Sequence, residues 1–476
     1  MIESYTDSVQ RYEAVFTKQF EDKGFKWDVY VKTDDLKTSQ TIRCSSARRF
    51  YCGRKNARCS SAAALCTSWS YLNDTAGEPV QELYDYLRDE TDYPMDLIWK
   101  NMIRTMHPHD FTRNLALTRI IEPTVLDEAT AQSIRQNRRI VLAMHLYFMD
   151  MLDSSKAFAA KFPPETNIFI STSSADKKPQ IEAAFADLNV RSVTVTVVEN
   201  QGRDVGAFLC DLAPQLRDYD YACFMHDKKA IQTRPGSVGA SFGYVCNENV
   251  CKNAAHVLNV LCEFEKDPYL GILCPPYPTH GLYFMNMCSG GWGPNFENTK
   301  KLMKDLGIDA PVSGEKSPIA PYGSVFWFRP KALAPLFDHG WQHSDFPPEP
   351  LPQDGTISHA IERIYPFVAQ SAGYYPAVVM SKSYAVTHND TMQAYAGGVI
   401  RPLARVFDCT TFYGAVSSAT GFAYKKHHLF SHYGPYSDSR RRHARNWLRD
   451  NLPQAPTRSS STPSALSLAP TRPYED

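Results

Sequence analysis

Two carboxylates in the segment from Asp345 to Tyr365 stand where acid–base chemistry could occur. Glu349 lies in a proline-rich, acidic loop, and Asp354 precedes a run whose apolar residues recur at helical spacing. A carboxylate at a rigid helix start beneath a polar loop can be held toward a ligand. The N-cap position of that helix would also explain Asp354. The sequence leaves both roles open.

A glycine-containing turn carries the next candidates, Asn200 and the triplet Gly202-Arg203-Asp204. Gly202 permits a tight turn, and the planar guanidinium of Arg203 fits a phosphate or a carboxylate. Asp204 can cap the following helix or bind the hydroxyls of a sugar or a ribose. The structural alternative is that Arg203 and Asp204 only pair with neighbouring side chains.

The third cluster is His226-Asp227-Lys228-Lys229, directly after an apolar segment that predicts a buried strand. Its two lysines can offset the charge of a diphosphate without a metal ion. Asp227 is its single carboxylate and therefore its one candidate metal ligand. The alternative is that Lys228 and Lys229 form a solvated edge.

Strands alternate with helices through the middle of the chain, which predicts a largely parallel sheet covered by helices. The expected strands are 138–148, 167–172, 193–198 and 219–225, separated by helices at 149–162, 177–188 and 204–216. Ligands bind such sheets at the carboxyl ends of the strands. We therefore expect the polar clusters at the ends of these strands to converge: His145 and Tyr147, Ser171 to Ser173, Glu199 to Gly206, and His226 to Lys229.

Other parts of the chain predict shorter elements. These are helices at 8–22, 79–88 and 95–106, a strand at 27–32, a connector at 109–135, a Gly/Ser-rich loop at 231–245 and an aromatic strand at 325–328.

The run DFPPEPLPQDGTISHAIERIYPF, which contains Asp354, is similar to the hallmark of the rhamnan synthesis protein F family, and the blocks GRDVG and FWFRP strengthen the resemblance. The resemblance covers most of residues 1 to 400, apart from residues 40 to 70. The family consists of bacterial glycosyltransferases of cell-wall and surface polysaccharide synthesis. The resemblance implies transfer of L-rhamnose from dTDP-rhamnose to a growing polysaccharide. It also favours a functional role for the triplet that begins at Gly202.

The order strand, Asn-x-Gly turn, helix, strand and polar cluster resembles the nucleotide-sugar half of GT-A glycosyltransferases, so we expect a GT-A-like α/β domain. By that analogy Asp354 takes the proton of the acceptor hydroxyl, and Glu349 is the competing base. GT-A enzymes usually carry a metal-binding DxD motif where this chain has His226-Asp227-Lys228. The family has HTKKS-like text at this place, so metal dependence stays open.

The same analogy borders the acceptor site with the aromatic strand, here represented by Trp327 and Arg329. His359, one helical turn beyond Asp354, would orient the acceptor or face the core. Trp292 and Asn295 offer a face for a sugar ring, or else Trp292 is a buried structural residue.

The chain is expected to contain an N-terminal α/β-helical region at 1–134, the GT-A-like domain at 135–400, a C-terminal helical extension at 401–452 and a disordered tail at 453–476. Residues 40–70 hold four cysteines without a zinc-site spacing. We interpret that stretch as a shifted reading frame. The resemblance also implies that the chain begins inside a longer protein.

The balance of charge and the pattern of apolar residues limit the kinds of partner that we expect for this chain. Lys plus Arg number 51, as do Asp plus Glu, and this balance gives no support to nucleic-acid binding. No secretory signal and no apolar run long enough to span a bilayer are present. We expect a cytoplasmic protein whose basic stretch from Arg440 can touch the inner membrane surface. Its partners would be a nucleotide sugar and a polysaccharide or lipid-linked glycan acceptor. A non-catalytic polysaccharide-assembly or scaffold module is the alternative function.

Overall fold

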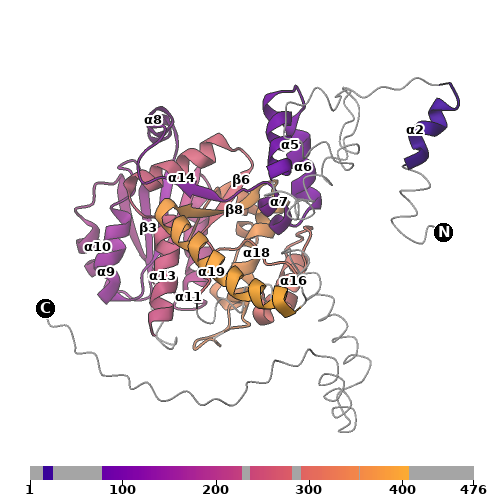
Figure 1. Cartoon of the computed structure of the whole chain (residues 1–476). Coiled ribbons are helices and arrows are strands. Elements are labelled where there is room, and N and C mark those ends of the chain that lie inside the picture. The colour runs from indigo at the N-terminus through magenta and orange to yellow at the C-terminus, as the bar shows by residue number, and fades with distance from the viewer. Residues whose placement is uncertain (1–13, 25–77, 228–235, 281–290, 353, 407–476) are drawn as a thin grey trace, which may run out of the picture. The chain divides into compact units, whose positions relative to one another are not determined.

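The computed structural model describes residues 14–24, 78–227, 236–280, 291–352 and 354–406. The chain divides into two units, Met1–Thr391 and Met392–Asp476, and the first contains the sheet with the helices that cover it (Figure 1). The predictions for Lys228, Lys229, residues 27–32 and 40–70, the helical extension beyond 406 and the tail at 453–476 lie outside the described residues.

Eight strands form one sheet in the order β1-β8-β6-β7-β5-β2-β3-β4. Neighbouring strands are parallel except around β7, which runs antiparallel to β5 and β6. The predicted α/β fold with a mostly parallel sheet is confirmed, and it is consistent with a GT-A-like domain. The strands are β1 Arg119–Ile121, β2 Ile140–His145, β3 Asn167–Thr172, β4 Ser192–Val197, β5 Tyr221–His226, β6 Leu270–Cys274, β7 Phe326–Phe328 and β8 Tyr375–Ser381.

Helices cover both faces of the sheet, which is why the central strands are apolar without alternation. In β2, Leu142 belongs to the core on one face and Ala143 to the core on the other. The first face is covered by α6 Met95–Thr105, α7 Pro108–Asn114, α8 Glu128–Asn137, α9 Leu152–Ala159, α10 Lys177–Phe185, α13 Gly236–Val250 and α14 Ala254–Lys266. The second is covered by the π-helical η6 Ala207–Leu212, α12 Ala213–Leu216, α16 Phe296–Asp305, α17 Ala334–Phe337 and α18 Ile357–Ser371.

The remaining described helices are short or lie at the ends. They are α2 Ala14–Glu21, α5 Glu78–Asp89, η5 Met149–Met151, α11 Arg203–Gly206, η7 Gly293–Asn295, η8 Pro330–Leu333, η9 His343–Asp345 and α19 Lys382–Val406. The helices predicted at 79–88, 95–106, 149–162, 177–188 and 204–216 are confirmed. Within the described ranges, no helix has both the length and the apolar character needed to cross a bilayer.

Two sequence predictions about loops are wrong. The expected connector at 109–135 contains α7, β1 and α8; β1 has three residues, only one of them buried, and leaves little periodic signal. The expected mobile loop at 231–245 is helical from Gly236 onward, in α13. Phe242, Val245 and Cys246 bury one face of that helix, and its glycines obscure this pattern in the sequence.

Candidate active site

The carboxyl edge of the sheet brings together polar side chains from neighbouring strands. His145 ends β2 and pairs in register with Ser171 of β3 on one side and with His226 of β5 on the other. The His145 Nδ1 atom lies 2.9 Å from the Ser171 hydroxyl. The predicted convergence of these strand ends is therefore confirmed.

The antiparallel direction of β7 decides which of its flanking residues reach this edge. The turn before β7 lies here, since the Gly323 carbonyl oxygen is 2.7 Å from His226 Nε2. Arg329, after β7, lies at the opposite edge, where its guanidinium donates to the carbonyl oxygens of Leu270 and Asp267. The prediction that Arg329 borders the acceptor site is wrong, because it requires β7 to run parallel to its neighbours.

Trp327 is also misplaced by the sequence reasoning. Its side chain is fully buried in the middle of β7, stacks on Phe162 and donates from Nε1 to the Val250 carbonyl oxygen at 2.9 Å. Such a ring cannot contact an acceptor sugar. Trp292 is buried as well, and its Nε1 donates to two backbone carbonyl oxygens. For Trp292, the structural alternative is correct.

The glycine turn before α11 has the tight geometry expected from its sequence. Gly202 has φ +81° and Arg203 has φ +54°, and the Gly206 N–H donates to the Gly202 carbonyl oxygen at 2.8 Å. A Cβ atom on Gly202 would lie 2.6 Å from the Phe346 ring. Asn200 is exposed on the same turn. The turn thus depends on glycine both for its backbone angle and for its close packing.

The loop before α18 packs directly on this turn. Gln201 donates from Nε2 to the Phe346 carbonyl oxygen at 2.5 Å, and His343 Nδ1 lies 3.2 Å from the Gln201 carbonyl oxygen. The second ring nitrogen of His343 is 2.9 Å from Asp211 of η6. Two segments that are far apart in the chain are therefore in direct contact.

Arg203 and Glu349 belong to this contact. Arg203 Nη2 donates to the Leu351 carbonyl oxygen at 3.1 Å, and its Nε lies 3.8 Å from Glu349 Oε1. The other Glu349 oxygen accepts the Leu351 N–H at 2.9 Å. Both Glu349 oxygens are thus engaged by the protein. The Arg203 side chain is still 41% exposed, so part of its guanidinium faces solvent.

Asp204 and the two histidines set the charge of the edge. Asp204 Oδ2 is 3.7 Å from His226 Nε2. Burial lowers the pKa of His145 to about 4, and the opposing effect of the Asp204 carboxylate is smaller. His145 is therefore neutral at pH 7.

Asp227 orders the loop after β2. Its Oδ2 accepts the N–H groups of Tyr147 at 2.7 Å and Phe148 at 2.5 Å, and its side chain is almost fully buried. Burial raises its pKa, and the two backbone donors oppose that effect. The described residues hold no group of three His, Cys, Asp or Glu side chains that could bind a metal. Asp227 thus uses one carboxylate oxygen to hold the backbone after β2.

The sequence offers the N-cap position of α18 as one explanation for Asp354, but Asp354 does not cap this helix. The N-cap is Thr356, whose hydroxyl lies 2.7 Å from His359 Nδ1. Asp354 Oδ1 accepts two donors at 2.7 Å, the Gly355 N–H and the Asn295 side-chain amide. Its side chain is 44% exposed. The carboxylate is fixed by neighbours and still reaches solvent.

Helix α18 connects Asp354 to the strand edge. His359 Nδ1 lies 3.9 Å from Asp354 Oδ1, and one turn later Glu362 accepts the Gly323 N–H at 2.6 Å. The carbonyl of the same Gly323 faces His226. Because α18 also packs against α11 and α16, it holds the candidate base and the candidate donor-binding turn in one assembly.

The sequence reasoning misses the roles of three contributors. Glu362 lies inside a helix whose sequence pattern gives no sign of a role at the site, although it belongs to the same acidic segment as Asp354. The sequence analysis names Asn295 only as part of a face for a sugar ring. Its contact with Asp354 joins residues 59 positions apart. Lys177, at the start of α10, donates to the Tyr147 carbonyl oxygen at 2.8 Å and adds a cation to this edge.

Comparison with known proteins identifies relatives of this chain. The sequence matches the family model described as rhamnan synthesis protein F over residues 1–374. Two relatives, each named uncharacterized protein WxcX and from two strains of Xanthomonas campestris pv. campestris, are 28% identical over 290 residues. The matched part is 60% of this chain and 38% of each relative. The chain thus spans well under half the length of these relatives.

Proposed function

The chain belongs to the rhamnan synthesis protein F family, which implies a role in rhamnan or related polysaccharide synthesis, and on that premise we propose that it is a glycosyltransferase. It transfers a sugar, L-rhamnose, from dTDP-rhamnose to a polysaccharide or lipid-linked glycan acceptor. The transfer takes place in the cytoplasm, with peripheral contact to the inner face of the membrane.

One observation carries this proposal: polar contacts join the glycine turn before α11 to the loop before α18, and the end of β5 to α18 itself by way of the turn before β7. These contacts run from Arg203 through the loop at Glu349, and from His226 through Gly323 to Glu362. Ligands of open α/β sheets bind at this edge. A site built from three separate segments suits a two-substrate reaction, with the donor on one side and the acceptor on the other.

The donor diphosphate binds, in this proposal, beside Arg203 and His226. The exposed part of the Arg203 guanidinium offers planar donors to phosphate oxygens. Asp204 binds the hydroxyls of the ribose or of the sugar, as carboxylates commonly do. Lys228 and Lys229 follow Asp227 directly in the sequence and supply further positive charge for the leaving diphosphate.

Asp354 is the better of the two candidate bases. Both Glu349 oxygens contact protein groups and its side chain is 29% exposed, whereas the Asp354 side chain is 44% exposed and only its Oδ1 accepts hydrogen bonds from the described residues. In the reaction, the acceptor hydroxyl passes its proton to Asp354, and its oxygen forms a bond to the anomeric carbon. The bond from that carbon to the diphosphate breaks, and its electron pair leaves with dTDP. His359 orients the acceptor.

A ligand panel tests the donor half of the proposal. The purified chain is heated with dTDP, UDP, GDP, dTDP-rhamnose and other nucleotide sugars, with and without Mg²⁺ or Mn²⁺. A ligand present at about 100 times its Kd adds about 2.7 kcal/mol to the free energy of unfolding. We expect dTDP and dTDP-rhamnose to raise Tm, and Asp204→Ala to abolish the rise. A cooperative transition that no nucleotide shifts would instead favour the non-catalytic assembly module.

A further inference from the structure

Asp354 is held by a neighbour from another helix in a way that distinguishes its two oxygens. Asn295 closes η7 and its side chain is fully buried. The Asn295 Nδ2 group donates to Asp354 Oδ1 at 2.7 Å and to the Trp292 carbonyl oxygen at 3.1 Å. Together with the Gly355 N–H, this saturates Oδ1.

The second oxygen faces an unusual glycine. Gly293, in the same short helix as Asn295, has φ +55°, and a Cβ atom placed on it would lie 3.2 Å from Asp354 Oδ2. No described donor lies within hydrogen-bond distance of Oδ2. A side chain at position 293 would occupy the space next to that oxygen.

From this geometry we propose that Asn295 and Gly293 are the positioning residues of the transfer reaction. Asn295 fixes Oδ1, so that Oδ2 is the atom that takes the proton, and Gly293 keeps the approach of the acceptor hydroxyl to Oδ2 open. The inference rests on the proposed role of Asp354 as the base. It assigns that role to one oxygen and gives Asn295 a task other than filling the core.

The side-chain amide of Asn295 has a feature that fits such a task. Its Oδ1 atom is buried and has no hydrogen-bond partner among the described residues. An unpaired buried acceptor costs about 1–3 kcal/mol. The protein tolerates this cost while the amide nitrogen is held on Asp354, as expected if the orientation of that carboxylate is what the residue provides.

The decisive variant is Asn295→Asp, which keeps the size of the side chain and replaces the donor by a carboxylate. Two carboxylates at this distance repel each other, so the first proton binds the pair more tightly. We expect the acidic limb of the pH profile for dTDP release from dTDP-rhamnose to move to higher pH. Asn295→Ala should lower kcat about 10- to 100-fold with little change in dTDP affinity, because a misplaced base loses rate and not binding.

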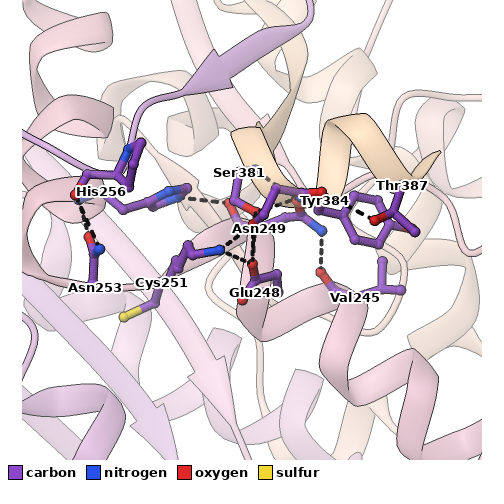
Figure 2. Close-up of polar contacts among 12 residues, drawn as sticks. Val245, Glu248, Asn249, Cys251, Asn253, His256, Ser381, Tyr384 and Thr387 are labelled. Atoms are coloured by element: carbon purple, nitrogen blue, oxygen red, sulfur yellow. Dashed lines mark hydrogen bonds and ion pairs between the residues drawn. The ribbon is translucent and has the colours of Figure 1, made fainter. Parts of the chain in front are cut away.

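Matched controls separate positioning from general loss of stability. Asn249 is equally buried, and its side chain joins the Val245 carbonyl oxygen to the Ser381 N–H in a network between α13 and the end of β8 (Figure 2). Asn249→Ala should lower Tm and leave kcat unchanged. Gly307 also has a positive φ but open space around it. Gly307→Ala should keep activity, whereas Gly293→Ala should raise the KM of the acceptor or abolish turnover.

A readout without turnover keeps this inference distinct from the proposed function. In protein labelled with ¹³C at the aspartate carboxyl carbons, the Asp354 signal is identified by its loss in Asp354→Asn. Its titration midpoint should rise in Asn295→Asp, whether or not the protein turns over a nucleotide sugar. An unchanged midpoint in a folded Asn295→Asp variant, or equal kcat in Asn295→Ala and wild type, would overturn the inference. Absence of turnover in the wild type would count against the function alone.

Discussion

The contact between Gly202 and Phe346 gives a prediction whose size follows from the structure. In Gly202→Ala the new Cβ atom would lie 2.6 Å from Phe346 Cγ and 3.0 Å from the Gly206 Cα atom. Phe346 cannot move freely, because it is buried and packs against Trp341. The substitution must therefore shift the loop before α18 away from the turn.

Two costs add in this variant. A non-glycine residue at φ +81° loses about 1 kcal/mol of stability. Overpacking of a buried contact costs about 1–3 kcal/mol more. We expect the free energy of unfolding to fall by about 2–4 kcal/mol, measured from urea midpoints. The control Gly307→Ala has a similar φ, +66°, with no atom in reach of the new methyl group, and should lose only about 1 kcal/mol.

The comparison also has a functional consequence. Displacing the loop separates Arg203 from Glu349 and Leu351, so dTDP should bind more weakly to Gly202→Ala than to Gly307→Ala. If both variants lose the same stability and bind dTDP alike, the turn does not depend on Phe346 and the two motifs are not one site.

Three further predictions test individual assignments. Trp327→Phe should lower the free energy of unfolding by about 1–3 kcal/mol, because it leaves the buried Val250 carbonyl oxygen unpaired. The KM of the acceptor should stay unchanged. A raised KM would restore the acceptor role of Trp327. Burial lowers the pKa of His256 from 6.5 to about 4, so the native state binds fewer protons than the unfolded chain between these values. The stability that neutral His256 contributes should thus be fully present above pH 6.5 and should fall as the pH drops toward 4. His256→Gln should flatten the dependence of the urea midpoint on pH. A variant with the same pH dependence as the wild type would refute the assignment. Asp354→Asn should reduce dTDP release about 10²- to 10⁴-fold, whereas Glu349→Gln should stay within a few-fold of wild type, and the reverse order would make Glu349 the base.

The sequence predicts the central strands well because they are buried on both faces. The strand at 167–172 has the bounds that its apolar run suggests, and the strand predicted at 193–198 differs by one residue at each end. The convergence of His145 and His226 follows from the same pattern, since parallel strands end at one edge. The sequence alone therefore predicts that His145 and His226 lie near each other at that edge.

The errors at the candidate site share a physical origin in long-range pairing. The direction of β7 depends on its partners β5 and β6, and nothing in the text FWFRP reveals it. Its antiparallel direction removes Arg329 from the site and brings Gly323 into it. The hydrogen bond from Asn295 to Asp354 likewise depends on how α16 packs against α18, so local spacing carries no signal for it.

The most direct test of the central claim is release of dTDP from dTDP-rhamnose in the presence of a rhamnose oligosaccharide. It is measured on the full chain, on Asp354→Asn and on Asn249→Ala, after binding of dTDP-rhamnose to each has been verified by calorimetry. We predict oligosaccharide-dependent dTDP release by the wild type and by Asn249→Ala, and loss of release with retained binding in Asp354→Asn. Binding without release in the wild type, or release that is unaffected in Asp354→Asn, would contradict the proposed transfer at this site.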